Sequence, residues 1–191
     1  MRRQFRLASV MLFVSLLLQA CGAHYYSILR KNSRDQQLYS ADTFSAALMW
    51  DVVFLNPTMR NALWKYETEV MEKPAEIDSR ILPASKVRGT QFIVSLYAPK
   101  NASTFSLDKN SFWSLKLDDG QSEYTPVAIE QLEKDVLFNR LIPYTYHWSK
   151  SYLVTFAGDF KLPFTLRMVG ASGKSTIVWK VSKHAPLSQY P

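Results

Sequence analysis

The residue with the clearest potential chemistry is Cys21, the only cysteine among 191 residues. Its thiol could serve as a packing group, a reactive nucleophile or the attachment point of another molecule. Three arginines precede it, and the run from Leu7 to Leu18 is uncharged and mostly apolar. This run has 12 residues, whereas a membrane-spanning helix needs roughly 20. Residues 1–20 therefore fit a secretory signal peptide with a positive start and a short apolar core.

The stretch Leu18-Gln19-Ala20-Cys21 resembles the lipobox of bacterial lipoproteins, where leucine, a variable residue, a small residue and cysteine follow one another. Gln19 departs from the small or hydroxyl residues that are commoner at its position. The resemblance covers only the first 21 residues. It implies a diacylglyceryl thioether on the Cys21 thiol, cleavage between Ala20 and Cys21, and acylation of the new amine. One acyl chain binds a membrane reversibly, whereas two or more bind stably.

Gly22 follows the cysteine. In lipoproteins of enterobacterial type an Asp at this position favours inner-membrane retention, so the resemblance implies the outer membrane here. With Cys21 used for the anchor, the mature chain retains no thiol for a disulfide, a thiolate metal site or a catalytic nucleophile. The sequence therefore predicts a cell-envelope protein attached to its membrane through lipid.

The charge balance is basic but diffuse. The chain has 23 Lys and Arg against 16 Asp and Glu, for a formal net charge of +7, and three of the arginines lie in the signal segment. Such a surplus favours contact with anionic lipid headgroups. It lacks the concentrated basic patch of a nucleic-acid-binding protein, so we expect no nucleic-acid partner.

Two motifs resemble ligand-binding loops but are better explained as turns. In "GASGKS" (residues 170–175), Met168 stands where a phosphate-binding loop needs glycine, and a strand-like run follows instead of a helix. In "LDDGQSE" (residues 117–123) the spaced ligands of a calcium loop are missing. The three histidines, which also lack metal-ligand spacing, are His24, His147 and His184. The sequence predicts no metal and no cofactor.

Asp51 is the only charge between Phe44 and Leu55. A carboxylate in apolar surroundings must reach water, pair with a cation or become protonated. Arg60 and Lys65 are the nearest cations along the chain. We expect a structural ion pair or a surface position, with an acid of raised pKa in a cleft as the alternative.

The stretch "PYTYHWSKSY" gathers aromatic side chains that have polar tips. Tyr144, Tyr146 and Trp148 are candidate contact residues for a partner, since large rings give contact area at a low entropic cost. The same rings could instead close one end of a core.

The N-terminal half of the mature chain is expected to be helical. Residues 21–38 are polar and predict a lipidated tether, in which Tyr25 and Tyr26 either sit at the membrane interface or are disordered. Residues 40–55 are apolar on nearly every side, which predicts a buried helix. Asn56-Pro57 then begins a second helix, whose residues at helical spacing are Met59, Leu63, Tyr66 and Val70. Together these predict a helical hairpin over residues 39–73.

The remainder predicts mostly strands. A linker of residues 74–86 leads into a domain of residues 87–184, and residues 185–191 form a C-terminal tail. Strand-like alternation recurs there, with hairpin signals at Asp119-Gly120 and at residues 171–173. Residues 127–142 read as a helix or a long crossing connection. The fold class is therefore α+β: a helical hairpin followed by an antiparallel immunoglobulin-like β-sandwich of about seven strands.

These features predict a non-enzymatic binding or assembly module, lipid-anchored and presented to a protein partner in the periplasm or at the cell surface. One alternative is a carrier of lipid or another apolar ligand, whose cavity would be lined by Phe44, Leu48, Trp50 and Phe54. A second alternative is an envelope hydrolase, in which Asp51 or a glutamate of the second helix acts with His147.

Overall fold

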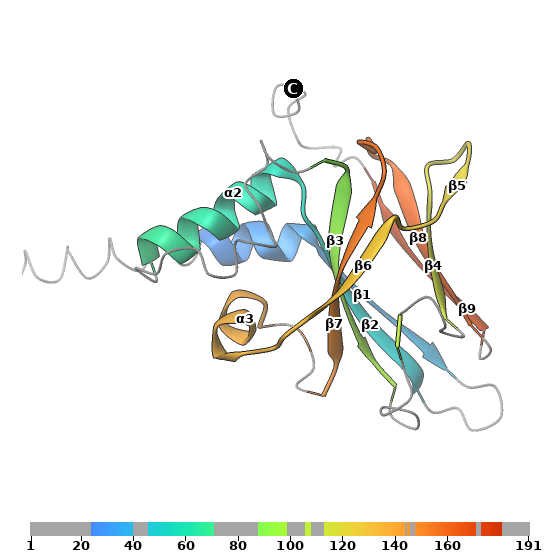
Figure 1. Cartoon of the computed structure of the whole chain (residues 1–191), viewed down its shortest axis with the longest axis horizontal. Helices are drawn as coiled ribbons and strands as arrows, with labels where there is room; N and C mark the ends of the chain where they lie inside the picture. Colours follow the sequence, from blue (N-terminus) through green and yellow to red (C-terminus); the bar gives the residue numbers. More distant parts are fainter. Residues whose placement is uncertain are drawn as a thin grey trace, which may run out of the picture. The chain divides into compact units, whose positions relative to one another are not determined.

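The computed structural model describes residues 24–39, 46–70, 88–98, 106–107, 113–143, 145, 148–170 and 173–180. The signal segment, Cys21, the linker of residues 74–86 and the C-terminal tail lie outside the described residues. The chain divides into two compact units. The helical unit contains the described residues 24–33 and 55–70, and the sandwich unit contains the others (Figure 1).

Two β-sheets form the sandwich unit (Figure 1). The strand order is β1-β2-β3-β7-β6 in the five-stranded sheet and β5-β4-β8-β9 in the four-stranded sheet. The pairs β2–β3, β3–β7, β6–β7, β4–β5, β4–β8 and β8–β9 are antiparallel. The strands are β1 (Ser33–Tyr39), β2 (Ala46–Phe54), β3 (Thr90–Tyr97), β4 (Ser114–Asp118), β5 (Glu123–Tyr124), β6 (Ala128–Leu132), β7 (Lys150–Phe156), β8 (Phe164–Gly170) and β9 (Gly173–Trp179). The prediction of a β-sandwich is confirmed.

The strand signals downstream of residue 87 lead to the structure that they predicted. Alternate residues of β3 and β7, among them Phe92 and Val154, enter the core between the sheets. The β4–β5 hairpin forms at Asp119-Gly120, where Gly120 has a φ of 89°. Asp119 Oδ1 accepts hydrogen bonds from the backbone N–H groups of Gln121 and Ser122 at 2.9 and 2.8 Å. A short acidic side chain thus holds the turn, as such residues often do.

The segment that resembled a phosphate-binding loop is a β-hairpin. Gly170, the last residue of β8, pairs with Gly173, the first residue of β9. Lys174 and Ser175 lie within β9, so a strand stands where a phosphate-binding loop requires the start of a helix. The prediction of a turn is confirmed.

The prediction of a helix over residues 40–55 is wrong, because residues 46–54 form β2. Its residues are buried on both faces of the sheet: Trp50 and Val52 point into the core between the sheets, while Val53 lies on the other face and is 3% exposed. A strand buried on both faces has a continuous apolar run without period-two alternation. Such a run cannot be told from a buried helix by periodicity alone.

The helical unit contains residues 24–32, which are helical, together with α2 (Pro57–Lys65) and the π-helical turn η1 (Tyr66–Val70). The predicted start of α2 is confirmed: Asn56 Oδ1 accepts a hydrogen bond from the Met59 N–H at 2.8 Å. Residues 24–32 and β1 occupy the segment where the sequence predicted a tether. The helix of residues 24–32 satisfies polar side chains locally, since Asn32 Nδ2 donates to the Ile28 carbonyl at 2.9 Å.

The helix of residues 24–32 runs antiparallel to α2 and η1. Near its start, the Tyr25 ring stacks on the Tyr66 ring with centroids 4.3 Å apart. At its end, Asn32 Oδ1 accepts a hydrogen bond from Asn56 Nδ2 at 2.6 Å. A pair of helices therefore exists, but β1 and β2 lie between its members in the sequence, so the predicted contiguous hairpin of residues 39–73 is wrong.

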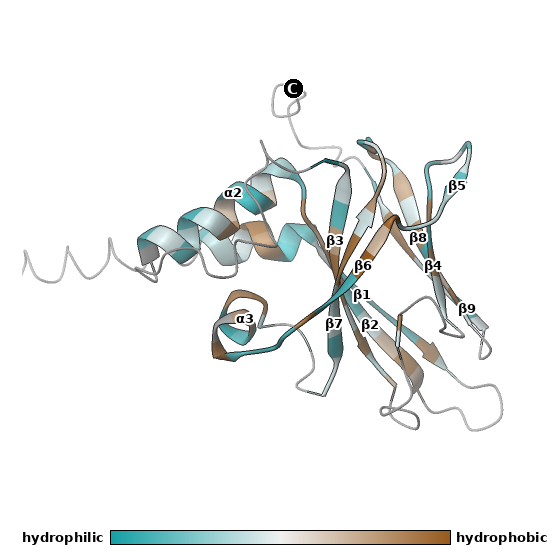
Figure 2. Ribbon diagram, in the orientation of Figure 1, coloured by the Kyte–Doolittle hydropathy of each residue, from teal (hydrophilic) through white to brown (hydrophobic). Residues whose placement is uncertain are grey.

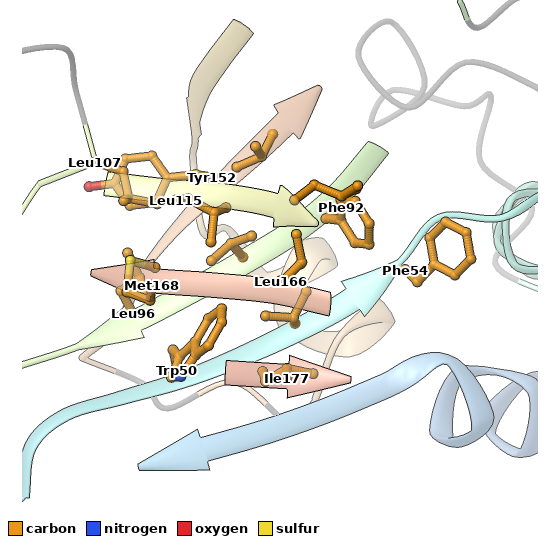
Figure 3. Packing of buried hydrophobic residues seen from close by; sticks show 14 of the residues in the cluster. Trp50, Phe54, Phe92, Leu96, Leu107, Leu115, Tyr152, Leu166, Met168 and Ile177 are labelled. Carbon is orange, nitrogen blue, oxygen red and sulfur yellow. The ribbon is translucent and has the colours of Figure 1, made fainter. Parts of the chain in front are cut away.

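The core between the sheets is rich in aromatic side chains (Figure 3). The rings of Phe54, Phe92, Phe164 and Trp179 contact one another, with centroid separations from 5.1 to 6.3 Å. Such edge-to-face and offset contacts add to the free energy gained by burying the rings. The core also holds one buried polar contact, in which Trp50 Nε1 donates to Ser175 Oγ at 2.9 Å.

The second face of the five-stranded sheet is buried as well. Its residues Val53, Ile93 and Leu153 are at most 3% exposed. Helix α3 (Val136–Leu141), which is capped by Asp135 Oδ1, is drawn on this side of the sheet in Figure 1. Both α2 and α3 mix hydrophobic and hydrophilic residues, as helices with one buried face do (Figure 2). Residues 127–142, expected as a helix or crossing connection, contain β6 and α3.

The Trp50–Ser175 contact predicts the effect of a single substitution. Ser175→Ala leaves the indole N–H without its acceptor in the core, and an unsatisfied buried donor costs about 1–3 kcal/mol. We therefore expect a loss of this size in the free energy of unfolding, measured by urea denaturation.

The matched control is Thr176→Ala, the neighbouring residue of β9, whose side chain is exposed. It should change the free energy of unfolding by no more than about 0.5 kcal/mol. Equal losses in the two variants would show that the indole contact contributes nothing specific.

Candidate functional site

A row of polar side chains crosses the second face of the five-stranded sheet. Asp51 on β2 pairs in register with Ser95 on β3, and Ser95 pairs with Ser151 on β7. Cross-strand partners point to the same side of a sheet. Ser95 and Ser151 are 1% and 0% exposed, and their Oγ atoms are 2.7 Å apart, within hydrogen-bond distance.

Two further polar residues extend this row beyond the strands. Lys134 follows β6, and its Nζ donates to Ser149 Oγ at 2.8 Å and to the Ser149 carbonyl oxygen at 3.3 Å. Ser149 immediately precedes β7 and is 6% exposed. We refer to these residues together as the buried polar cluster: Asp51, Ser95, Lys134, Ser149 and Ser151.

The electrostatics of the cluster depend on Asp51. Its pKa is raised from 3.8 to about 7, mainly by burial and also by repulsion from Asp35 on β1, while attraction to Lys134 lowers it. Burial also lowers the pKa of Lys134, while the charge of Asp51 raises it. Within the described part of the chain, the buried Oδ2 of Asp51 has no hydrogen-bond partner.

The expected ion pair or surface position of Asp51 is not found among the described residues, where its side chain is partly buried. The alternative was an acid with a raised pKa in a cleft, and of this the raised pKa is confirmed. The cation that lowers this pKa is Lys134, whereas the sequence pointed to Arg60 and Lys65 as ion-pair partners. Lys134 is distant in sequence and is brought close to Asp51 by the pairing of β6 with β7 and of β7 with β3.

A lysine amine hydrogen-bonded to a serine hydroxyl has the arrangement of an activated nucleophile. Here, however, Ser149 is almost completely buried, and the same Lys134 amine also binds the Ser149 backbone carbonyl. Ser95 and Ser151 satisfy each other. These contacts are those of a structural network, which fastens the start of β7 to the connection between β6 and α3.

Of the residues named as candidates for function, Asp51 belongs to this cluster. Cys21, Tyr144, Tyr146 and His147 lie outside the described residues. Trp148 is described, lies in the turn before β7 and is 75% exposed. Trp148 directly precedes Ser149 in the sequence, so an exposed aromatic residue is next to one member of the buried polar cluster.

Sequence reasoning missed most of the buried polar cluster. The only available signals were serines inside otherwise apolar strands, such as Ser95 on the mixed face of β3 and Ser151 on β7. Nothing near Lys134 or Ser149 in the sequence distinguishes them, because their contact depends on where β6 and β7 meet.

Opposite its apolar positions, the second helix carries charged residues such as Arg60, Lys65, Glu67 and Glu69, and their spacing predicts a solvated face. The structure exposes only part of this face. Lys65 and Glu69 are exposed and lie 3.6 Å apart as an i,i+4 pair, as expected for a solvated face. Arg60 and Glu67 are 4% and 0% exposed, so for them the prediction is wrong. Arg60 Nε donates to the Leu55 carbonyl at 2.8 Å, and burial lowers the pKa of Arg60 to about 10.

The side chains suggested for an apolar-ligand cavity are part of the core. Leu48, Trp50 and Phe54 pack between the sheets, and Phe44 lies outside the described residues. In the described ranges, no three His, Cys, Asp or Glu residues are placed to hold a metal ion. Among the helices described, none combines the length and the apolar character that crossing a membrane requires.

Comparison with known protein families, curated proteins and solved structures finds no match to this chain.

The raised pKa of Asp51 predicts a pH-dependent stability. The unfolded chain loses this proton near pH 4 and the folded protein near pH 7, so the free energy of unfolding falls as the pH rises between these values. Asp51→Asn removes the ionisation. We expect the variant to be more stable than the wild type by roughly 1–2 kcal/mol at about pH 8, with little difference near pH 4. Water around the partly exposed carboxyl group screens its charge and keeps the difference to this size.

Urea denaturation across this pH range measures the difference. Glu130→Gln removes an exposed carboxylate from neighbouring β6 and should stay within about 0.5 kcal/mol of the wild type. Lys134→Gln removes the cation that lowers the pKa of Asp51 and should move the transition to higher pH. A constant difference between Asp51→Asn and the wild type would contradict the assignment.

Proposed function

We propose that this chain is a lipid-anchored protein of the cell envelope, held in the outer membrane, that presents its folded part to a protein partner in the periplasm or at the cell surface. The observation that carries the proposal is the sequence Leu18-Gln19-Ala20-Cys21 after an arginine-rich start and a short apolar run. In this proposal Cys21 carries the acyl chains, and residues 1–20 are removed.

The position of the first described element supports this anchor. The helix of residues 24–32 begins three residues after Cys21, so removal of residues 1–20 spares every described helix and strand. The sandwich core is built from packed aromatic and aliphatic side chains. Such a fold does not need a disulfide, which suits a chain whose one cysteine is acylated.

We also propose that the sandwich is of the immunoglobulin-like type. In that type, strands A, B, E and D of one sheet face strands C, F and G of the other, and a C′ strand can extend the second sheet. The order β2-β3-β7-β6 corresponds to A-B-E-D, and the order β5-β4-β8-β9 corresponds to C′-C-F-G. Strand β1 is then an addition beside strand A.

The proposed role is non-enzymatic. In the most reactive arrangement among the described residues, Lys134 with Ser149, the Ser149 side chain is buried and both groups are engaged in structural contacts. In immunoglobulin-like domains the loops cluster at the two ends of the sandwich, and in variable domains the loops of one end form the binding surface. The proposed contact residues are Tyr144, Tyr146 and Trp148, of which Trp148 is 75% exposed. Confinement to a membrane would raise the effective concentration of this surface near a membrane-bound partner.

The anchor is tested by Cys21→Ser. In cells fed labelled palmitate, the wild-type protein should incorporate label, and the variant should lose it completely and keep its signal segment. The reason is that a serine hydroxyl cannot form the thioether. A variant that still carries label and sediments with membranes would refute the lipobox assignment.

Gly22→Asp is the matched control in an enterobacterial host. It leaves the thiol in place, so labelling should persist, while the protein should move from the outer-membrane to the inner-membrane fraction. Unchanged fractionation would contradict the proposed outer-membrane location and leave the anchor itself intact.

The partner surface is tested by a photo-crosslinking amino acid placed at Trp148. We expect a discrete adduct in intact cells, because the side chain at this position is exposed. The control position is Val136 on α3, which is 86% exposed and outside the proposed surface. Identical adducts at both positions, or none at Trp148, would exclude Trp148 as a contact residue.

A further inference from the structure

The antiparallel helix pair has one end that lies close to the anchor site. Tyr25 is four residues after Cys21, and four residues span at most about 14 Å. At this end Tyr25 stacks on Tyr66 with ring centroids 4.3 Å apart, and the Tyr26 and Tyr66 hydroxyl oxygens are 3.3 Å apart. The Asn32–Asn56 contact marks the opposite end. We call the first of these the tyrosine end of the helical unit.

An acylated Cys21 would place the tyrosine end beside the headgroups of the bilayer. The headgroup layer of one leaflet is about 5–8 Å thick, which is less than the reach of the four connecting residues. The tyrosine end therefore cannot leave the neighbourhood of the membrane surface while Cys21 is anchored. This step rests on the proposed function.

The tyrosine end presents one large aromatic side chain that the helix pair does not bury. Trp64 is 44% exposed and stands two positions before Tyr66, about 3 Å along the helix axis. Tyr25 is 2% exposed and Tyr66 7%, so these two rings are used within the pair. Indole rings are enriched at membrane interfaces, because an apolar ring and a polar N–H suit the headgroup layer.

The described surface of the helical unit carries a small surplus of positive charge. Among its described residues the exposed cations are Arg30, Lys31 and Lys65, and the exposed carboxylate is that of Glu69. Cations near an anionic membrane surface each contribute about 1 kcal/mol to binding. Arg30 and Lys31 lie next to Asn32 at the opposite end, and at the tyrosine end Lys65 pairs with Glu69 at 3.6 Å, so the argument for the tyrosine end rests on the nearby anchor and on Trp64.

We propose that the tyrosine end of the helical unit docks on the lipid bilayer surface, with the Trp64 side chain inserted among the headgroups. The anchor then does more than tether: it holds the helical unit against the membrane in one orientation. From the sequence, Tyr25 and Tyr26 were expected either to contact the interface themselves or to be disordered; in the structure they pack with Tyr66 at the end that presents Trp64.

The test uses the chain from Cys21 to Pro191, which contains every described residue and has Cys21 as its single thiol. Coupling this thiol to a maleimide lipid places the protein on vesicles of phosphatidylcholine and phosphatidylglycerol without cellular acylation. The acyl chains are brominated near the headgroups, and bromine quenches tryptophan fluorescence only at close range. Because the coupling is chemical, failure of cellular acylation does not affect the result.

We expect quenching of the wild-type protein relative to vesicles that lack bromine. Trp64→Phe should lose this quenching, and Trp64→Tyr, a second variant with a large polar ring, should lose it too. Trp148→Phe removes the most exposed described tryptophan and should keep the wild-type quenching. Absence of quenching in the wild type, or its persistence in both Trp64 variants, would overturn the proposal.

Discussion

The packing of aromatic rings between the two sheets is the interaction on which the rest of the structure depends. Phe54, Phe92, Phe164 and Trp179 come from four strands and contact one another in this core. Removing this large apolar area from water is the dominant favourable contribution to folding. Because the contacts join β2, β3, β8 and β9, they hold segments from both halves of the chain in one sandwich.

Burial of β2 on both faces is a direct consequence, and it explains Asp51. Because the side chains of Trp50 and Val52 point into the core, the alternation of the strand places the Asp51 side chain on the second face of the sheet. This second face is itself largely buried. The carboxyl group there has its pKa raised to about 7. The serine pair and Lys134 compensate by supplying polar neighbours, so the buried polar cluster follows from the fold and does not by itself indicate catalysis.

Helix pairing in this protein is a long-range event. Residues 24–32 pack against α2 and η1 although β1 and β2 intervene in the sequence. The apolar positions of α2 were visible from their spacing, and Met59 and Leu63 are indeed buried. Their partner was not visible, because short local patterns carry no information about which distant segment covers an apolar face. Because residues 24–32 are largely polar, the sequence predicted a tether there and gave no sign of a helix that packs on α2.

The sequence by itself determined the local features: the strand alternation of β3 and β7, the β4–β5 and β8–β9 hairpins and the start of α2. Each depends on residues within a few positions of one another, so local propensity and spacing suffice. Tertiary structure alone decided that residues 46–54 are a strand, that Arg60 and Glu67 are buried, and that Asp51 lies near Lys134. These outcomes depend on which faces meet after the chain has folded, and a continuous apolar run is compatible with either a buried helix or a buried strand until packing selects one.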